Sequence, residues 1–131
     1  MFTALKTACD HGGPLLGVRE APLVPGSRLI SALELRFNEV TVTLSAADDD
    51  EISVTPAPLP QPTPTHPSTP SVWSRCIGKR LCWAWLLTNQ QGYSDGVRLE
   101  FGDPDSPESV VVELVVAASS LHPFVSQPAE G

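Results

Sequence analysis

The chain has 131 residues, a formal net charge of −7, 14 prolines and three cysteines. Its length suits one domain, and no apolar run is long enough for a transmembrane helix, so the sequence predicts no membrane partner. The negative charge repels phosphate backbones, which argues against nucleic acid and favours a basic protein partner. The N-terminus lacks the features of a signal peptide, and an odd number of cysteines at unpatterned spacings indicates free thiols in a reducing, cytoplasmic compartment.

The first half of the chain predicts a short helix followed by strands. Apolar residues between positions 2 and 8 can form one helix face, which two glycines end, and residues 15–18 suit a short strand. Apolar positions 33, 35 and 37, and then 40, 42 and 44, alternate with polar ones. This pattern predicts a hairpin turning at Asn38 and Glu39, and a third strand over residues 51–55 completes a meander.

Residues 55–70 form a proline-rich segment that contains seven of the 14 prolines. Proline removes backbone donors and fixes φ, so this segment cannot join a strand ladder. We predict an extended, polyproline-II-like or disordered loop insertion within one domain that spans residues 1–131. Pro64 to Pro67 matches the P-x-x-P pattern, but no arginine flanks it, which favours a spacer over an SH3-type ligand.

Residues 81–101 hold two of the three tryptophans and the one tyrosine. Leu81, Trp83, Trp85 and Leu87 recur at period two, and the residues between them are also mostly apolar. This pattern predicts a central strand whose tryptophans serve the core. The Asp95-Gly96 pair favours a type I′ turn before a second strand over residues 97–101, and further strands are predicted at 110–116 and 121–125.

These elements predict a mainly β protein with six or seven antiparallel strands. The strands would form a meander sheet or a partly open barrel, with room for one short N-terminal helix. The alternative is an α+β fold in which that helix packs on one sheet face.

The loop between the two central strands is the densest polar group beside aromatic residues. Amides both donate and accept hydrogen bonds and tyrosine supplies amphipathic area, so the loop suits a binding surface. The alternative is a structural loop whose side chains bond its own backbone. The candidate binding residues are Asn89, Gln90, Gln91, Tyr93 and Asp95.

Other candidate sites are weaker. The acidic run Asp48, Asp49, Asp50 and Glu51 could hold a divalent metal, but it lacks the spaced ligands and glycine of an EF-hand loop. A solvated acidic turn that protects a sheet edge is the favoured interpretation.

Catalytic and cofactor sites find no support in the sequence. Cys76 and Cys82 with His66 or His122 lack zinc-ligand spacing, and no motif of nucleophilic catalysis occurs. Three basic residues at positions 75, 79 and 80 are too few for a nucleic-acid footprint. We predict no catalytic residue, no cofactor and no metal.

Residues 77–101 also carry a resemblance to a known family. Their pattern, I-G-K-x-L-x-W-x-W-x-L-T-N-Q-Q-G-Y-x-D-G-x-x-L-E-F, resembles that of a family of small bacterial proteins of unknown function. The D-D-E-I run at Asp49–Ile52 and the A-S-x-L run at Ala118–Leu121 fit the same family. The resemblance implies a bacterial origin and a single domain, and it implies no activity.

The sequence is compatible with three functions. The first is a non-catalytic protein-binding module of an accessory or immunity type that neutralises a basic partner. The second is a small-molecule or divalent-metal-binding domain, or a small enzyme, that uses the acidic turn with Asp95 and Glu100. The third is a purely structural domain, and the sequence predicts no oligomeric state for any of them.

Overall fold

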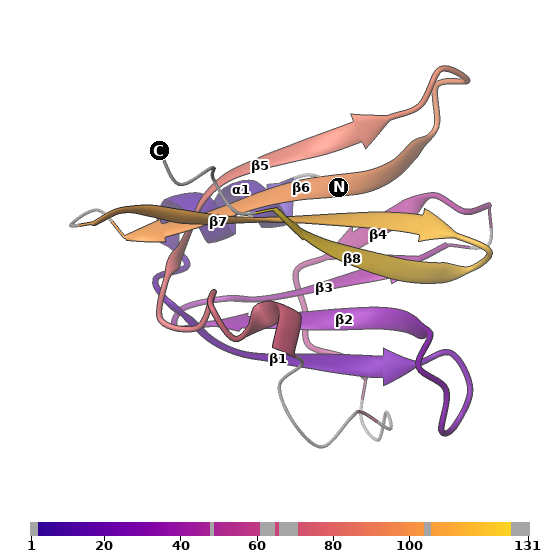
Figure 1. Cartoon of the computed structure of the whole chain (residues 1–131), viewed down its shortest axis with the longest axis horizontal. Helices are drawn as coiled ribbons and strands as arrows, with labels where there is room; N and C mark the ends of the chain where they lie inside the picture. The colour runs from indigo at the N-terminus through magenta and orange to yellow at the C-terminus, as the bar shows by residue number, and fades with distance from the viewer. Residues whose placement is uncertain (1–2, 48, 61–64, 66–70, 104–105, 127–131) are drawn as a thin grey trace.

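The computed structural model describes residues 3–47, 49–60, 65, 71–103 and 106–126 (Figure 1). One N-terminal helix precedes eight strands, so the protein is mainly β and the predicted count of six or seven strands is too low. The elements are α1 (Thr3–His11), β1 (Leu15–Pro22), β2 (Ile30–Phe37), β3 (Thr41–Ala46), β4 (Ile52–Thr55), the 3₁₀ turn η1 (Ser71–Trp73), β5 (Arg80–Thr88), β6 (Ser94–Asp103), β7 (Ser106–Ala117) and β8 (Ser120–Ser126).

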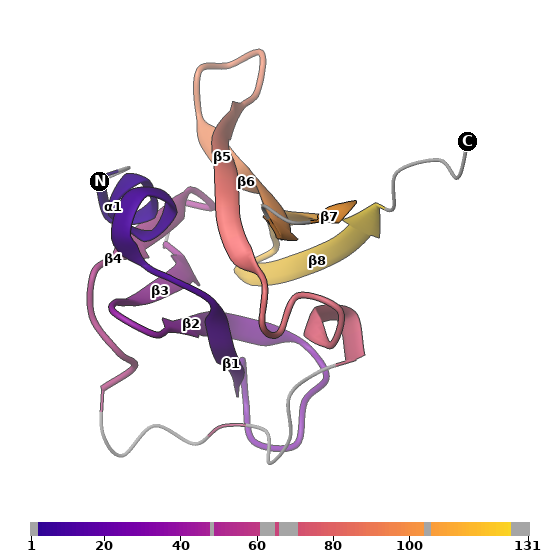
Figure 2. The ribbon, with the colours of Figure 1, turned by 90° about the vertical axis from the view of Figure 1, so that its left-hand side faces the viewer.

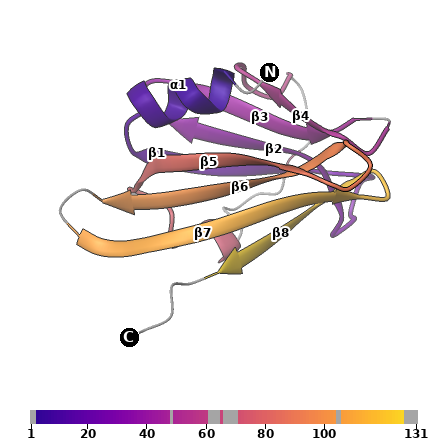
Figure 3. The ribbon, with the colours of Figure 1, turned by 90° about the horizontal axis from the view of Figure 1, so that it is seen from above.

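The strands form one antiparallel sheet that curls into a half-barrel. Its order is β4-β3-β2-β8-β7-β6-β5, and β1 pairs with β2. The groups β1–β4 and β5–β8 are joined through β2 and β8, which share a single registered pair, Ile30 with Leu121. Figure 2 shows the two groups curling around a common interior, and Figure 3 shows β5 to β8 following one another in order.

Helix α1 partly closes the curl. It contacts β3, β4 and β5, and it buries Ala4, Leu5 and Ala8 against the sheet (Figure 2). Just after the C-terminal end of α1, the amide of Leu15 donates to the Lys79 carbonyl and the amide of Gly78 donates to the Leu15 carbonyl, both at 2.8 Å. These bonds tie the start of β1 to the segment before β5.

The core lies where the two strand groups face each other. The ring of Phe37 on β2 stacks on that of Phe101 on β6 with 6.4 Å between centroids, and the edge of Trp73 meets Phe101 at 6.1 Å. All three side chains are buried. Each contributes on the order of 1.5–3 kcal/mol or more through burial, so the core is centred on these aromatic rings.

The meander predicted from alternating residues in the first half of the chain is confirmed. Strands β2 and β3 pair in register from Ala32 with Ser45 to Arg36 with Thr41, and β3 then pairs with β4. The amide of Phe37 donates to the Val40 carbonyl at 2.8 Å, so the chain reverses at Asn38 and Glu39 as the sequence predicts.

The first residues of the proline-rich segment cover the outer face of β2 and β3. The Thr43 hydroxyl donates to the Ala57 carbonyl at 2.7 Å, and the amide of Leu59 donates to Glu34 Oε2 at 2.8 Å. Leu59 is itself buried. The rest of the predicted insertion, apart from Thr65, lies outside the described residues up to position 70.

Candidate functional site

A bulge in β5 decides which side chains face the solvent. Leu81 pairs with Phe101, but Trp83 pairs with Glu100, so Cys82 is an extra residue in β5. One extra residue reverses the alternation that follows it. Leu81 therefore points into the core at 1% exposure, whereas Trp83 is 62% exposed and Trp85 is 43% exposed. The prediction that both tryptophans serve the core is wrong, because periodicity alone does not reveal a bulge.

Strand β5 is also an edge strand rather than the central strand that the sequence predicts. It ends the sheet order and pairs only with β6. Its apolar residues on both faces suggested cover on both sides. The structure instead leaves Trp83, Trp85 and Leu86 exposed, while α1 contacts the strand.

The exposed tryptophans belong to a larger surface on the outer face of β5 to β8. The strand registers place Trp85, Arg98, Glu113 and Phe124 opposite one another in a row that crosses all four strands. Directly opposed residues share a face, and Phe124 is 59% exposed. We call this surface the aromatic face and define it by Trp83, Trp85, Arg98, Glu113 and Phe124.

The aromatic face is ordered by stacking and by charge. The rings of Trp83 and Trp85 stack with 6.5 Å between centroids and 26° between planes. The guanidinium of Arg98 lies over Trp85, 5.3 Å from the ring centroid, and its Nε is 4.0 Å from Glu113 Oε1. These contacts hold two large rings in fixed orientations at the surface, where exposed pairs stabilise the fold only weakly.

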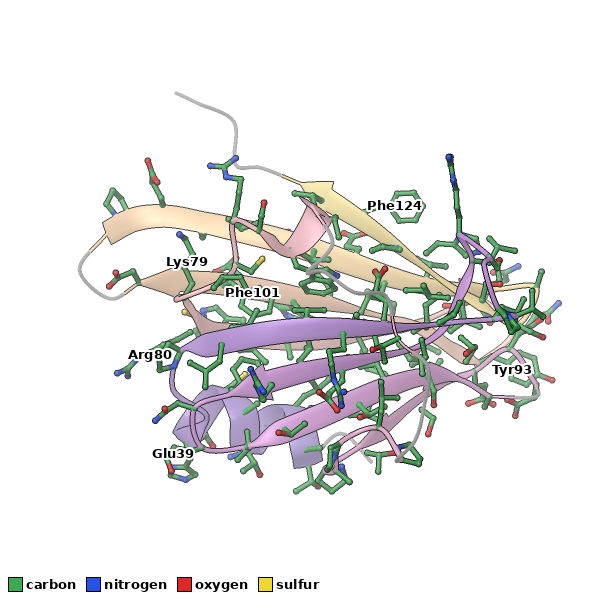
Figure 4. All side chains as sticks on the ribbon, turned by 90° about the horizontal axis from the view of Figure 1, so that it is seen from below. Glu39, Lys79, Arg80, Tyr93, Phe101 and Phe124 are labelled. Carbon is green, nitrogen blue, oxygen red and sulfur yellow. The ribbon has the colours of Figure 1, made fainter. Side chains whose placement is uncertain are left out.

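The hairpin tip between β5 and β6 is organised by the side chain of Asn89. Its Oδ1 accepts the amides of Gln91 at 2.9 Å and Tyr93 at 3.2 Å, and its Nδ2 donates to Asp95 Oδ2 at 3.3 Å. Asn89 and Asp95 therefore hold the loop in shape. Gln90, Gln91 and Tyr93 are exposed, and Tyr93 lies at the opposite end of the molecule from Arg80 (Figure 4).

The predicted Asp95-Gly96 turn is wrong, because both residues lie within β6. The chain reverses earlier, where the amide of Gly92 donates to the Asn89 carbonyl and Gly92 has a φ of 87°. Gly96 serves close packing instead. A Cβ there would lie 2.6 Å from the backbone oxygen of Leu114 on β7.

The acidic turn also bonds the backbone. Asp49 Oδ1 accepts the amide of Glu51 at 3.2 Å, and Asp50 Oδ1 accepts the amide of Ser119 at 3.0 Å. Asp50 thus joins the β3–β4 turn to the β7–β8 turn, while Asp48 lies outside the described residues. Among the residues that the structure describes, no three His, Cys, Asp or Glu side chains gather as a metal site.

A hollow opens beside Trp83 on the outer face, with a volume of about 390 Å³; we call it the Trp83 hollow. A smaller one of about 250 Å³ lies between α1 and β5 and shares Cys9, Cys82 and Trp83 with it. The Trp83 hollow is lined by Cys9, Arg80, Leu81, Cys82, Trp83, Glu100, Gly102, Asp103, Pro107, Glu108 and Ser109.

The thiols in and near these hollows are not activated. Burial raises the pKa of Cys9 and that of Cys76 to about 11. Burial, followed by the charge of Glu100, also raises the pKa of Cys82. Protonated thiols are poor nucleophiles, which argues against a Cys–His nucleophile. Among the described residues these thiols belong to no cluster of metal-ligating side chains, and His66 lies outside those residues.

Sequence reasoning missed two buried acidic residues, Glu20 and Glu34. Glu34 on β2 accepts two hydrogen bonds from the Arg19 guanidinium, both at 2.8 Å, in addition to the Leu59 amide. The bonds from Arg19, together with the Leu59 amide, lower the pKa of the Glu34 carboxyl. Glu34 alternates with apolar residues as solvent-facing residues do, and its burial involves the Leu59 amide of the proline-rich segment, whereas Arg19 stays partly exposed.

A family model matches residues 17–130, which is most of the chain. The chain belongs to DUF6334, a family of unknown function. The resemblance to a family of unknown function is thereby confirmed. No curated protein and no solved structure matches the chain. Membership in DUF6334 names no activity, so the function has to be argued from the surface of the protein itself.

The structure adds one finding about membranes. In the part of the chain that the structure describes, no helix combines the length and the apolar character that crossing a membrane requires.

Proposed function

We propose that the chain is a non-catalytic protein-binding module whose contact surface is the aromatic face. The observation that carries this proposal is the pair of stacked, exposed tryptophans, Trp83 and Trp85. Trp85 lies in the same cross-strand row as the exposed Phe124. Tryptophan is enriched among the residues that dominate binding energy at protein interfaces. The exposed aromatic side chains flank an exposed Arg98–Glu113 pair, and large exposed apolar side chains beside polar ones mark interaction sites on proteins.

The two halves of the sheet support this choice of surface. On β2 and β3, the outer face is covered by Ala57 and Leu59 of the same chain. On β5 to β8, three large aromatic side chains stay exposed on the outer face, those of Trp83, Trp85 and Phe124. The fold therefore covers a face that bears a charged pair and leaves open a face that bears three aromatic rings.

The partner we propose is a basic protein. The chain carries a net charge of −7, which attracts a basic surface over long range and raises its rate of encounter. An accessory or immunity-type role in a reducing, cytoplasmic compartment agrees with this charge and with three free cysteines. The exposed tip residues Gln90, Gln91 and Tyr93 remain proposed secondary contacts.

The test is capture of a partner from an extract of the source organism on immobilised protein. The double variant Trp83→Ala/Trp85→Ala is compared with Val24→Ala/Leu29→Ala, which removes comparably exposed apolar side chains away from the aromatic face. We expect the first variant to lose the partner and the second to retain it. Equal capture by both variants would refute the proposed surface, and Tyr93→Ala reports separately on the tip.

A further inference from the structure

Two neighbouring rows of the aromatic face differ in one chemical respect. In the first row, Trp85, Arg98 and Glu113 supply an aromatic ring, a guanidinium stacked on it and a carboxylate beside the guanidinium. In the next row, Trp83 stands opposite Glu100, and Glu100 stands opposite Val111. The second row thus repeats the ring and the carboxylate but supplies no cation of its own.

The Trp83 hollow is lined by the ring and the carboxylate of this second row, Trp83 and Glu100, so a cation in the hollow would lie beside both. Three carboxylate residues line it, Glu100, Asp103 and Glu108, against one basic residue, Arg80. The absence of a side chain at Gly102 helps to keep it open, since a Cβ there would come within 3.3 Å of the Cys82 sulfur. The hollow therefore combines an exposed aromatic wall with an excess of negative charge.

We infer that the basic partner inserts an arginine side chain into the Trp83 hollow, where its guanidinium stacks on Trp83 and pairs with Glu100. This inference rests on the proposed function and names the chemistry that the partner presents. Charge complementarity selects a cation for this hollow. Arginine suits it better than lysine because a planar guanidinium stacks on an indole and forms paired bonds to carboxylates.

The same protein supplies a template for the geometry. In the adjacent row one guanidinium, that of Arg98, lies over Trp85 and beside Glu113, which shows that a guanidinium on this face can contact a ring and a carboxylate together. At Trp83 the carboxylate of Glu100 stands directly opposite the ring, so the partner's guanidinium would approach both from outside the sheet. The hollow lies toward the end of the molecule that carries Arg80, opposite to Tyr93 (Figure 4). Binding of arginine at Trp83 is thereby separable from any contact at the hairpin tip.

The experiment uses a small probe and therefore needs no identified partner. Nα-acetyl-arginine methylamide is titrated into the full-length protein at low ionic strength, and the indole N–H signals of Trp83 and Trp73 are followed by NMR. The citrulline analogue, which has the same shape without the charge, is the control ligand. Trp73 is buried and is the internal reference.

We expect a saturable shift of the Trp83 signal with a Kd on the order of 1–30 mM for the arginine probe, and no saturable shift for citrulline. Glu100→Gln should weaken binding about three- to tenfold, and Arg80→Gln should strengthen it, because it removes the competing cation. Glu51→Gln makes the same change in net charge in the β3–β4 turn, outside the hollow and the aromatic face, and should alter the Kd less than about twofold.

The outcomes separate this inference from the proposed function. An equal response to citrulline, or equal effects of Glu100→Gln and Glu51→Gln, would overturn the arginine site while leaving partner capture on the aromatic face untouched. A specific arginine response supports the site even where capture does not depend on Trp83 and Trp85, and in that case the proposed function fails alone.

Discussion

Replacing Glu34 by alanine is predicted to destabilise the fold strongly, although the alternation of Glu34 with apolar residues indicates a surface position. Its carboxylate is buried, at 4% exposure, and accepts three hydrogen bonds, two from Arg19 and one from the Leu59 amide. Removing one partner of a buried ion pair costs about 3–5 kcal/mol, because the other partner remains without compensation. Arg19 is 39% exposed and can turn to water, which places the expected loss near 3 kcal/mol.

The assay is equilibrium unfolding in urea, with Glu113→Ala as the matched control. Glu113 faces Arg98 across neighbouring strands as Glu34 faces Arg19, but that pair is exposed and its closest atoms are 4.0 Å apart. We expect the control to lose less than about 1 kcal/mol. Small domains have a free energy of unfolding of about 5–15 kcal/mol, so a loss of about 3 kcal/mol clearly lowers the urea concentration at the midpoint of unfolding.

The same pair predicts an acid dependence. The pKa of Glu34 is lowered in the folded protein, so its contribution is present above the ordinary carboxyl pKa and is lost as the pH falls through the lowered value. The wild type should therefore lose stability on acidification more steeply than Glu34→Ala. If Glu34→Ala and Glu113→Ala unfold within 1 kcal/mol of each other, the burial of Glu34 by the proline-rich segment is refuted.

Four further predictions concern the hairpin and the thiols. Asn89→Ala should destabilise the protein by about 1–2 kcal/mol and speed amide exchange at the tip, which NMR measures, since two backbone amides lose their acceptor. Gly96→Ala should lower the melting temperature by several degrees, because its Cβ would meet the Leu114 oxygen at 2.6 Å. Iodoacetamide should label exposed Cys82 in the folded protein but buried Cys76 only on unfolding, as mass spectrometry resolves. Because the pKa of Cys76 rises from 9.0 to about 11 on folding, stability should fall between pH 9 and 11 as unfolded thiols ionise first; a flat profile would contradict its burial.

The sequence predicts the part of the fold that local alternation determines. Leu33, Leu35 and Phe37 point inward on β2 as their spacing indicates, and the turn at Asn38 and Glu39 follows from two alternating runs. These features depend on neighbours close in the chain. The predicted count of six or seven is lower than eight although each strand has a run that suggests it. The first of these runs, residues 15–18, is short, and in the structure β1 continues through Arg19 and Glu20 to Pro22 because it pairs with β2.

The candidate site depended on features that local patterns do not contain. The bulge at Cys82 moves Trp83 and Trp85 from the core to the surface, and only pairing with β6 reveals it. Likewise, an Asp-Gly pair predicts a turn, yet Gly96 is required in mid-strand by the approach of β7. The polar tip bonds its own backbone through Asn89, as in the structural-loop alternative that the sequence left open, while the binding role of the tip stays a prediction.

The central claim is that the aromatic face binds a protein partner, and the most direct measurement is the affinity of the captured partner for variants of that face. Residues that anchor interfaces contribute 2 kcal/mol or more each, which is about thirtyfold in Kd. We predict that Trp83→Ala/Trp85→Ala raises the Kd at least thirtyfold while Val24→Ala/Leu29→Ala changes it less than about twofold. A Kd that is the same for both double variants would contradict the account.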